Sequence, residues 1–303
     1  MFENIIGNEK NKEILKKAIE TQKISHSYIF WGIEGIGKML IAQQFARAIL
    51  CTKTKQNNCT CKSCIEFNTN NNPDFIEIEP EQGKIKIEKI REMQRKVAEK
   101  PIISEKKVYI INDAETMTTE AQNSLLKTLE EPPKYVTIIL VTANENNLLG
   151  TIKSRCTRMH FEGLTEEEIK KYIESNYEEK INQNIIELSQ GSIGQVINYK
   201  EHQELYSNIE QMVKNIKGKD LIQIQQEAEE IYKSKEEIKN ILEYINSLLL
   251  KLWKEDIRYV KCVEIIEDTK KRIKANSNYD MCIDNMIFNI WGEMNEKNNR
   301  GKI

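Results

Sequence analysis

The residues best suited to chemistry form a glycine-rich loop near the N-terminus. Residues 32–38 read Gly-Ile-Glu-Gly-Ile-Gly-Lys, which is the spacing of a phosphate-binding loop. In such a loop, glycines let backbone N–H groups face the phosphates, the lysine contacts the terminal phosphates, and a following Ser or Thr hydroxyl binds Mg²⁺. Here the next residue is Met39, whose thioether is a poor ligand for a hard cation. The candidate phosphate-binding residues are Gly32, Gly35, Gly37 and Lys38.

A second group of candidate residues follows the strand predicted at 108–111. Nucleotide-hydrolysing proteins place here an Asp for Mg²⁺ and, in one large class, a Glu that activates water. Asn112 and Asp113 stand at these positions. An amide is a weaker, neutral ligand, and Asp is one methylene shorter than Glu. Both acidic functions are therefore weakened. Two alternatives remain for the loop: it still binds ATP, or it keeps its fold without binding a nucleotide.

Four cysteines are crowded into a short segment with the pattern Cys-x7-Cys-x-Cys-x2-Cys. In a cytosolic chain, such crowding indicates a metal site rather than disulfides. Four thiolates suit a structural, tetrahedral Zn²⁺ that stabilises a loop too small to build its own core. The single residue between the second and third cysteines could distort this site, and reduced free thiols are the alternative. The candidate ligands are Cys51, Cys59, Cys61 and Cys64.

The elements that position these residues alternate between strands and helices over the first 160 residues. The apolar run at 28–31 leads directly into the glycine loop, and a helical pattern follows it. Further apolar runs rich in β-branched residues are typical of parallel strands covered on both faces. The alternation predicts a parallel α/β sheet with right-handed crossovers. The other strands are expected at 75–78, 108–111, 135–141 and 158–161, with helices at 87–98 and 119–130.

Beyond Gly163 only helical patterns remain. Thr165 and Glu168 have capping-box spacing, which predicts a helix start. The apolar stripe over 238–252 is interpreted as ordinary helical core, with a subunit-contact face as the alternative. We expect an α/β domain over 1–163 with a zinc-binding insertion at 51–64, a helical lid over 164–202, and an all-α C-terminal domain over 203–303.

Composition limits the function classes. The 303 residues include 45 basic and 47 acidic residues, so the net charge is −2 and does not fit a protein that coats DNA by itself. The first residues do not resemble a signal peptide, and no apolar run is long enough to span a membrane. We therefore expect a cytoplasmic protein.

Three segments carry a resemblance to a known family. Residues 107–115 read Lys-Val-Tyr-Ile-Ile-Asn-Asp-Ala-Glu, residues 123–133 read Asn-Ser-Leu-Leu-Lys-Thr-Leu-Glu-Glu-Pro-Pro, and residues 154–156 read Ser-Arg-Cys. The chain resembles the AAA+ subunits of bacterial sliding-clamp loaders over nearly its whole length, less distinctively in the C-terminal helices. This resemblance implies a P-loop α/β domain, a helical lid, and a C-terminal helical domain in a pentameric collar.

Departures from the family pattern point to one type of subunit. The family's ATPase subunits carry Ser or Thr after the loop lysine, Asp-Glu after the second strand, and an arginine soon after a Gly-Ser pair. This chain has Met39, Asn112-Asp113 and Gly194 at these places. With these three alterations, the chain resembles the delta-prime type of subunit of DNA polymerase III, in which ATP hydrolysis is not expected. The alternative is an active ATPase of the gamma/tau type that uses Lys38 and Asp113.

The resemblance also implies partners and a role for Arg155. The partners would be gamma/tau-type ATPase subunits and the delta subunit in a hetero-pentamer, which loads the sliding clamp onto primed DNA as part of the polymerase holoenzyme. Arg155 would act in trans as an arginine finger on a neighbour's γ-phosphate. The alternative is a surface arginine in a structural salt bridge.

Two smaller alternatives remain from the sequence. Thr142 and Asn144 follow a strand where polar residues of related ATPases sense the γ-phosphate, but a strand-end hydrogen bond explains them equally well. A zinc-dependent DNA-binding module is a further hypothesis, against which the near-neutral charge argues.

Overall fold

The computed structural model describes residues 1–53, 58–177 and 183–295. Contacts divide the chain into two compact units. The first unit comprises Met1–Glu178 with Gly191–Ile193, and the second comprises Glu179–Gln190 with Gly194–Ile303. The finer division into three domains, with boundaries after residues 163 and 202, stays a prediction.

The first unit is built on a five-stranded parallel sheet, which confirms the predicted α/β class. The strand order is β2-β3-β4-β1-β5, so β4 lies between β1 and β3. All pairs are parallel, so each connection between strands must cross over from one edge of the sheet to the other. The strands are β1 (Ser27–Trp31), β2 (Phe75–Ile78), β3 (Lys107–Ile111), β4 (Val136–Thr142) and β5 (Thr157–His160).

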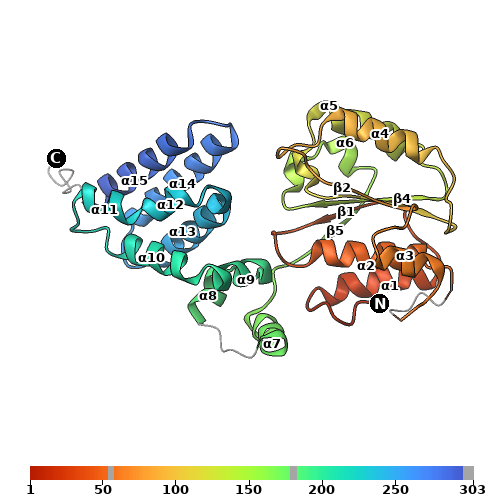
Figure 1. Cartoon of the computed structure of the whole chain (residues 1–303), viewed down its shortest axis with the longest axis horizontal. Coiled ribbons are helices and arrows are strands. Elements are labelled where there is room, and N and C mark those ends of the chain that lie inside the picture. Colours follow the sequence, from red (N-terminus) through yellow and green to blue (C-terminus); the bar gives the residue numbers. More distant parts are fainter. Residues whose placement is uncertain (54–57, 178–182, 296–303) are drawn as a thin grey trace. The chain divides into compact units, whose positions relative to one another are not determined.

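Helices cover both faces of this sheet (Figure 1). Residues of β3 and β4 are buried along their whole length, which explains why these strands are continuously apolar rather than alternating. Each face has its own apolar cluster, one around Phe30 and Phe45 and the other around Ile29 and Leu125. One face carries α1 (Glu9–Glu20), α2 (Lys38–Leu50) and α3 (Lys62–Asn68), and the other carries α4 (Ile87–Val97), α5 (Thr119–Glu130) and α6 (Gly150–Lys153).

Two helix starts follow local sequence signals. The Thr118 side chain caps α5 by accepting from the backbone N–H of Ala121. Thr165 and Glu168 form the predicted capping box at the start of α7 (Glu166–Asn176). Because each capping side chain satisfies an otherwise unpaired N–H group of the first helical turn, these boundaries are readable from sequence. Two short 3₁₀ segments, η1 (Ala114–Thr116) and η2 (Glu145–Asn147), follow β3 and β4.

The second unit is helical in every element that the structure describes. The predicted stripe on α13 is buried and forms one apolar cluster with residues of α14 and α15, which confirms its interpretation as core. No helix in the described ranges is long and apolar enough to cross a membrane. The elements are α8 (Gln183–Leu188), α9 (Ile193–Glu201), α10 (Gln203–Lys214), α11 (Leu221–Glu227), α12 (Glu229–Lys233), η3 (Lys235–Glu237), α13 (Ile238–Leu252), α14 (Arg258–Lys274) and α15 (Tyr279–Asn295).

A buried carboxylate fixes the segment that connects α4 to β3. Asp74, which precedes β2, has no exposed surface. Its carboxylate oxygens accept hydrogen bonds of 2.7 Å from the backbone N–H groups of Ile102, Ile103 and Ser104. A buried charge is tolerated only when it is fully hydrogen-bonded, and these donors meet that requirement. Side-chain hydrogen bonds, with those of Asp74 at their centre, therefore hold this connection in place of regular structure.

We expect Asp74→Ala to lower the free energy of unfolding by about 3 kcal/mol, because three backbone donors lose a charged acceptor. Urea denaturation followed by circular dichroism measures this change. Glu105→Ala removes an exposed acid from the same connection and serves as the matched control, with an expected effect of about 0.5 kcal/mol or less. Equal effects of the two variants would contradict the assignment.

Candidate functional site

The glycine loop lies at the carboxyl edge of the sheet, between β1 and α2, as predicted. Gly32 has φ 152°, and a Cβ atom there would lie 2.1 Å from the carbonyl oxygen of Phe161. Gly37 has φ 87° and forms the N-cap of α2. Side chains are disfavoured at both positions, by a backbone contact at the first and by the left-handed conformation at the second. The loop therefore keeps the geometry that the motif predicts.

The two residues after the last glycine point to different functions. Lys38 is 6% exposed, and its Nζ donates hydrogen bonds of 2.6 Å to the carbonyl oxygens of Gly32 and Ile33. The lysine side chain therefore folds onto the loop itself. Met39 is partly buried and packs against the apolar cluster of the α1 and α2 face. The position that supplies a magnesium ligand in working loops contributes here to the core.

The degenerate acidic pair lies at the same edge of the sheet as the loop, after β3. The backbone N–H of Asn112 donates to the carbonyl oxygen of Ile78 at 2.9 Å and extends the pairing of β3 with β2. Asp113 adopts a left-handed conformation with φ 47°, and its carbonyl oxygen accepts from the N–H and the hydroxyl of Thr116 at 2.8 and 2.7 Å. The geometry of this turn thus starts η1.

The polar residues at the end of β4 form local hydrogen bonds. Thr142 is 1% exposed, and its Oγ1 accepts from the backbone N–H of Asn144 at 3.1 Å. The Asn144 Oδ1 accepts from the backbone N–H of Asn146 at 3.0 Å and caps η2. These contacts are strand-end hydrogen bonds, the alternative to a γ-phosphate sensor.

Glu115 is a site residue that was not predicted from the sequence. Its Oε1 accepts from the backbone N–H of Ala143 at 3.0 Å, so it joins the turn after β3 to the end of β4. Its Oε2 is buried and has no hydrogen-bond partner among the described residues. Glu115 ends the segment 107–115 that carries the family resemblance, but its spacing from Asp113 does not distinguish it from a residue in a solvent-exposed turn.

Arg155 lies at the opposite edge of the sheet from the glycine loop. It follows α6 and precedes β5, and its carbonyl oxygen accepts from the Ser27 hydroxyl at 2.8 Å. Ser27 is the first residue of β1, whereas Gly32 follows its last residue. Five residues of extended chain span about 16 Å at about 3.3 Å per residue. Arg155 is therefore separated from the loop of its own chain by the full length of β1.

The guanidinium of Arg155 is held by groups of the same chain. Its Nη2 forms an ion pair with the Glu130 Oε1 at 2.5 Å, and its Nη1 donates to the Thr151 carbonyl oxygen at 2.9 Å. The side chains of Arg155 and Glu130 are 33% and 49% exposed. The salt-bridge alternative is thus present in the structure. Glu130 was part of the Leu-Glu-Glu-Pro-Pro motif, but only the fold brings it to Arg155.

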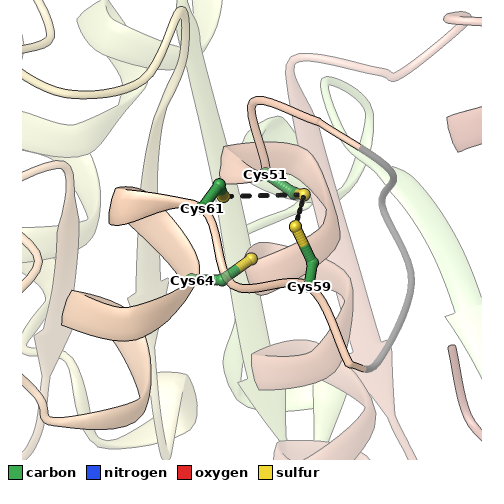
Figure 2. A group of neighbouring side chains, drawn as sticks. All are labelled: Cys51, Cys59, Cys61 and Cys64. Atoms are coloured by element: carbon green, nitrogen blue, oxygen red, sulfur yellow. Dashed lines mark hydrogen bonds between the residues drawn. The ribbon is translucent and has the colours of Figure 1, made fainter.

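The four clustered cysteines meet at the start of α3, and Figure 2 shows their side chains converging. All four sulfur atoms lie within 4.8 Å of one another. The Cys51 Sγ is 3.5 Å from the Cys59 Sγ and 3.9 Å from the Cys61 Sγ. Tetrahedral zinc with Zn–S bonds of about 2.3 Å separates its sulfur ligands by about 3.8 Å. The cluster could therefore hold a metal ion, and the single residue between Cys59 and Cys61 does not prevent convergence.

Burial and hydrogen bonds both shift the pKa values of the thiols, and hydrogen bonds to Thr52 and Cys64 lower the pKa of Cys61 despite burial. Burial is the largest effect on Cys64 and raises the pKa of this thiol, because a thiolate is poorly solvated inside the protein. Burial also raises the pKa of Cys156 to about 11, although a hydrogen bond with Ser27 opposes it. Cys262 and Cys282, which lie outside the cluster, are also buried.

Comparison with known proteins gives consistent results. Over 153 residues the chain is 37% identical to the DNA polymerase III subunit delta' of Bacillus subtilis (strain 168), covering 50% of this chain and 46% of that protein. Over 174 residues it is 34% identical to the subunit tau/gamma of Haemophilus influenzae, covering 57% of this chain and 25% of that protein. The matched segment thus spans less than half the length of either relative.

The fold is also found in a solved structure. The chain matches the DNA polymerase III gamma subunit-related protein of Thermotoga maritima with a TM-score of 0.52 and 20% identity, covering 92% of this chain and 99% of that one. At this identity the match concerns the fold alone, and it supports the predicted AAA+ class. The model of the family described as "DNA polymerase III, delta subunit" matches residues 7–165. Because this match covers more than half of the chain, the protein belongs to that family of clamp-loader proteins.

Proposed function

We propose that this protein is the delta-prime type of clamp-loader subunit, which supports ATP-dependent loading of a sliding clamp onto primed DNA without hydrolysing ATP itself. The observation that carries the proposal is a contrast between the two edges of the sheet. At the carboxyl edge the chain's own nucleotide site is altered, and at the amino edge Arg155 is presented at the surface. A match to both delta' and tau/gamma relatives is compatible with either type of subunit, so the proposal rests on these residues.

The altered site explains why hydrolysis is not expected. A working site holds Mg²⁺ through the loop hydroxyl and an acidic strand end, and here Met39 packs into the core while Asn112 replaces the acid. Gly194 provides no side chain at the lid position where ATPase subunits carry an arginine. The glycine geometry and Lys38 are retained, so the loop still offers a phosphate cradle. ATP binding without turnover is the expected behaviour.

The position of Arg155 supports an action on a neighbouring subunit. It cannot reach the phosphate loop of its own chain, because β1 separates the two. An arginine that stabilises charge on a γ-phosphate is worth roughly a thousandfold or more in turnover. Its pairing with Glu130 does not oppose this role, since exposed ion pairs contribute only about 0.2–1 kcal/mol. A γ-phosphate presented by a neighbour would therefore displace the carboxylate at little cost.

The second unit supports a role in assembly. Two large apolar side chains near the turn between α13 and α14, Trp253 and Ile257, are 42% and 69% exposed. A contact with another subunit would cover these side chains and remove their apolar surface from water. We propose that this unit joins gamma/tau-type and delta subunits in the pentamer, and that DNA and the clamp are contacted as part of that complex.

We further propose that the four cysteines bind one structural Zn²⁺. Their sulfur atoms fit the tetrahedral donor set. Residues 58–64 contain only the start of the short helix α3 and have little apolar core of their own. A bound metal would supply cross-links between α2 and α3 in place of such a core. The site has no open coordination position for chemistry.

The purified chain is expected to show no Mg²⁺-dependent ATP turnover, because the loop hydroxyl and the strand-end acid are both absent. A phosphate-release assay measures turnover, and nucleotide binding is followed separately by fluorescence titration. Met39→Thr restores only the hydroxyl and is expected to stay inactive. Turnover that disappears in Lys38→Ala would favour the gamma/tau-type alternative.

In a complex reconstituted with the ATPase subunits, delta and the clamp, Arg155→Ala is expected to lower hydrolysis at the adjacent site by up to about a thousandfold. Clamp-stimulated ATPase measurements detect this loss. Arg158→Ala is the matched control, since Arg158 is a nearby exposed arginine that pairs with Glu145. Glu130→Gln is expected to change the rate by less than about fivefold. An unchanged rate in Arg155→Ala would refute the trans-acting role.

Metal analysis of the full-length protein by mass spectrometry is expected to find one zinc per chain. Cys64→Ser should reduce this content strongly, because it removes one of four thiolate ligands. Cys262→Ser removes an equally buried thiol outside the cluster and should leave the zinc content unchanged. A wild-type chain free of zinc after purification without chelators would argue for reduced free thiols instead.

A further inference from the structure

Arg47 is a buried cation placed next to the cysteine cluster. It lies on α2 four residues before Cys51, which puts both residues on one helix face. Its side chain belongs to a residue only 7% exposed, and its Nε donates to the Asn68 Oδ1 at 3.1 Å. Asn68 in turn lies on α3 four residues after Cys64. The hydrogen bond therefore joins α2 to α3. On each side it lies one helical turn away from a cysteine of the cluster, Cys51 or Cys64.

The cluster needs positive charge from its surroundings if it holds zinc. Four thiolates around Zn²⁺ carry a net charge of −2, and buried charge is costly unless it is paired. Arg47 is buried, and its hydrogen bond to Asn68 holds the guanidinium between α2, whose C-cap is Cys51, and α3, which contains Cys64. A guanidinium also stays charged at all working pH values.

A neighbouring cation provides the contrast. Lys62 directly follows Cys61 and is therefore closer to the cluster in sequence than Arg47. Its side chain is 74% exposed and pairs with Glu66 across one helical turn at 3.9 Å. Because solvent screens exposed charges, Lys62 contributes little to the field at the cysteines. Burial and the anchor on Asn68 distinguish Arg47 from it.

We propose that Arg47, oriented by Asn68, is the counter-ion of the zinc–thiolate cluster and determines how tightly the metal is held. This inference rests on the proposed zinc site. On this view the side chain has two functions, since it balances the charge of the cluster and fixes the spacing of α2 and α3. An arginine with a purely structural role would only fix the spacing of α2 and α3.

The test measures zinc affinity of the full-length chain by competition with a chromophoric chelator. Arg47→Gln is expected to weaken zinc binding by about 10- to 100-fold, the usual range for groups that support metal ligands. Lys62→Gln makes the same change in formal charge and is expected to alter affinity by less than about twofold. Arg47→Lys keeps the charge but not the Nε donor, so its affinity should fall between those of wild type and Arg47→Gln.

Three results would overturn the proposal. Wild-type protein that binds no zinc would remove the zinc site itself, without bearing on the role of Arg155. Zinc bound equally well by Arg47→Gln and Lys62→Gln would leave the zinc site standing and refute the counter-ion. If Arg47→Gln does not fold, Asn68→Ala takes its place, because it removes the hydrogen bond to the Arg47 Nε without removing charge. Zinc release from Asn68→Ala at the wild-type rate would refute the anchored counter-ion.

Discussion

The direction of the parallel sheet is the constraint on which the other features depend. Since all five strands point the same way, every strand end meets at one edge and every strand start at the other. The glycine loop, Asn112 and Thr142 follow three adjacent strands and therefore share the carboxyl edge. Arg155 precedes a strand and lies at the amino edge. The same geometry that assembles one nucleotide site places the arginine out of its reach.

Fold and catalysis make different demands on the glycine loop. The fold requires positive φ values and close backbone contacts, which Gly32 and Gly37 provide. Hydrolysis requires a hydroxyl and a carboxylate for the metal, and this chain has neither at the usual positions. A Met39 side chain that packs with the core costs nothing in stability, since burying apolar surface is favourable. The scaffold can therefore persist after the chemistry is lost.

Polar side chains hold those segments of the first unit that have little apolar core. The segment before β3 is held by the buried Asp74 carboxylate, and the cysteine segment converges on four sulfur atoms with Arg47 beside them. Both arrangements are specific because a buried charge tolerates few alternative geometries. They hold irregular segments of the chain that no regular structure fixes.

The sequence by itself determined the parallel α/β class, the glycine loop, the capping box at Thr165 and the core stripe of α13, because each follows from local spacing or periodicity. It also identified the four cysteines and Arg155 as candidates. Only the tertiary structure decided that the cysteines converge, that Glu130 holds Arg155, and that Asp74, Glu115 and Arg47 are buried in specific contacts. These pairs are far apart in the chain, and no local pattern encodes which distant groups the packed sheet and helices bring together.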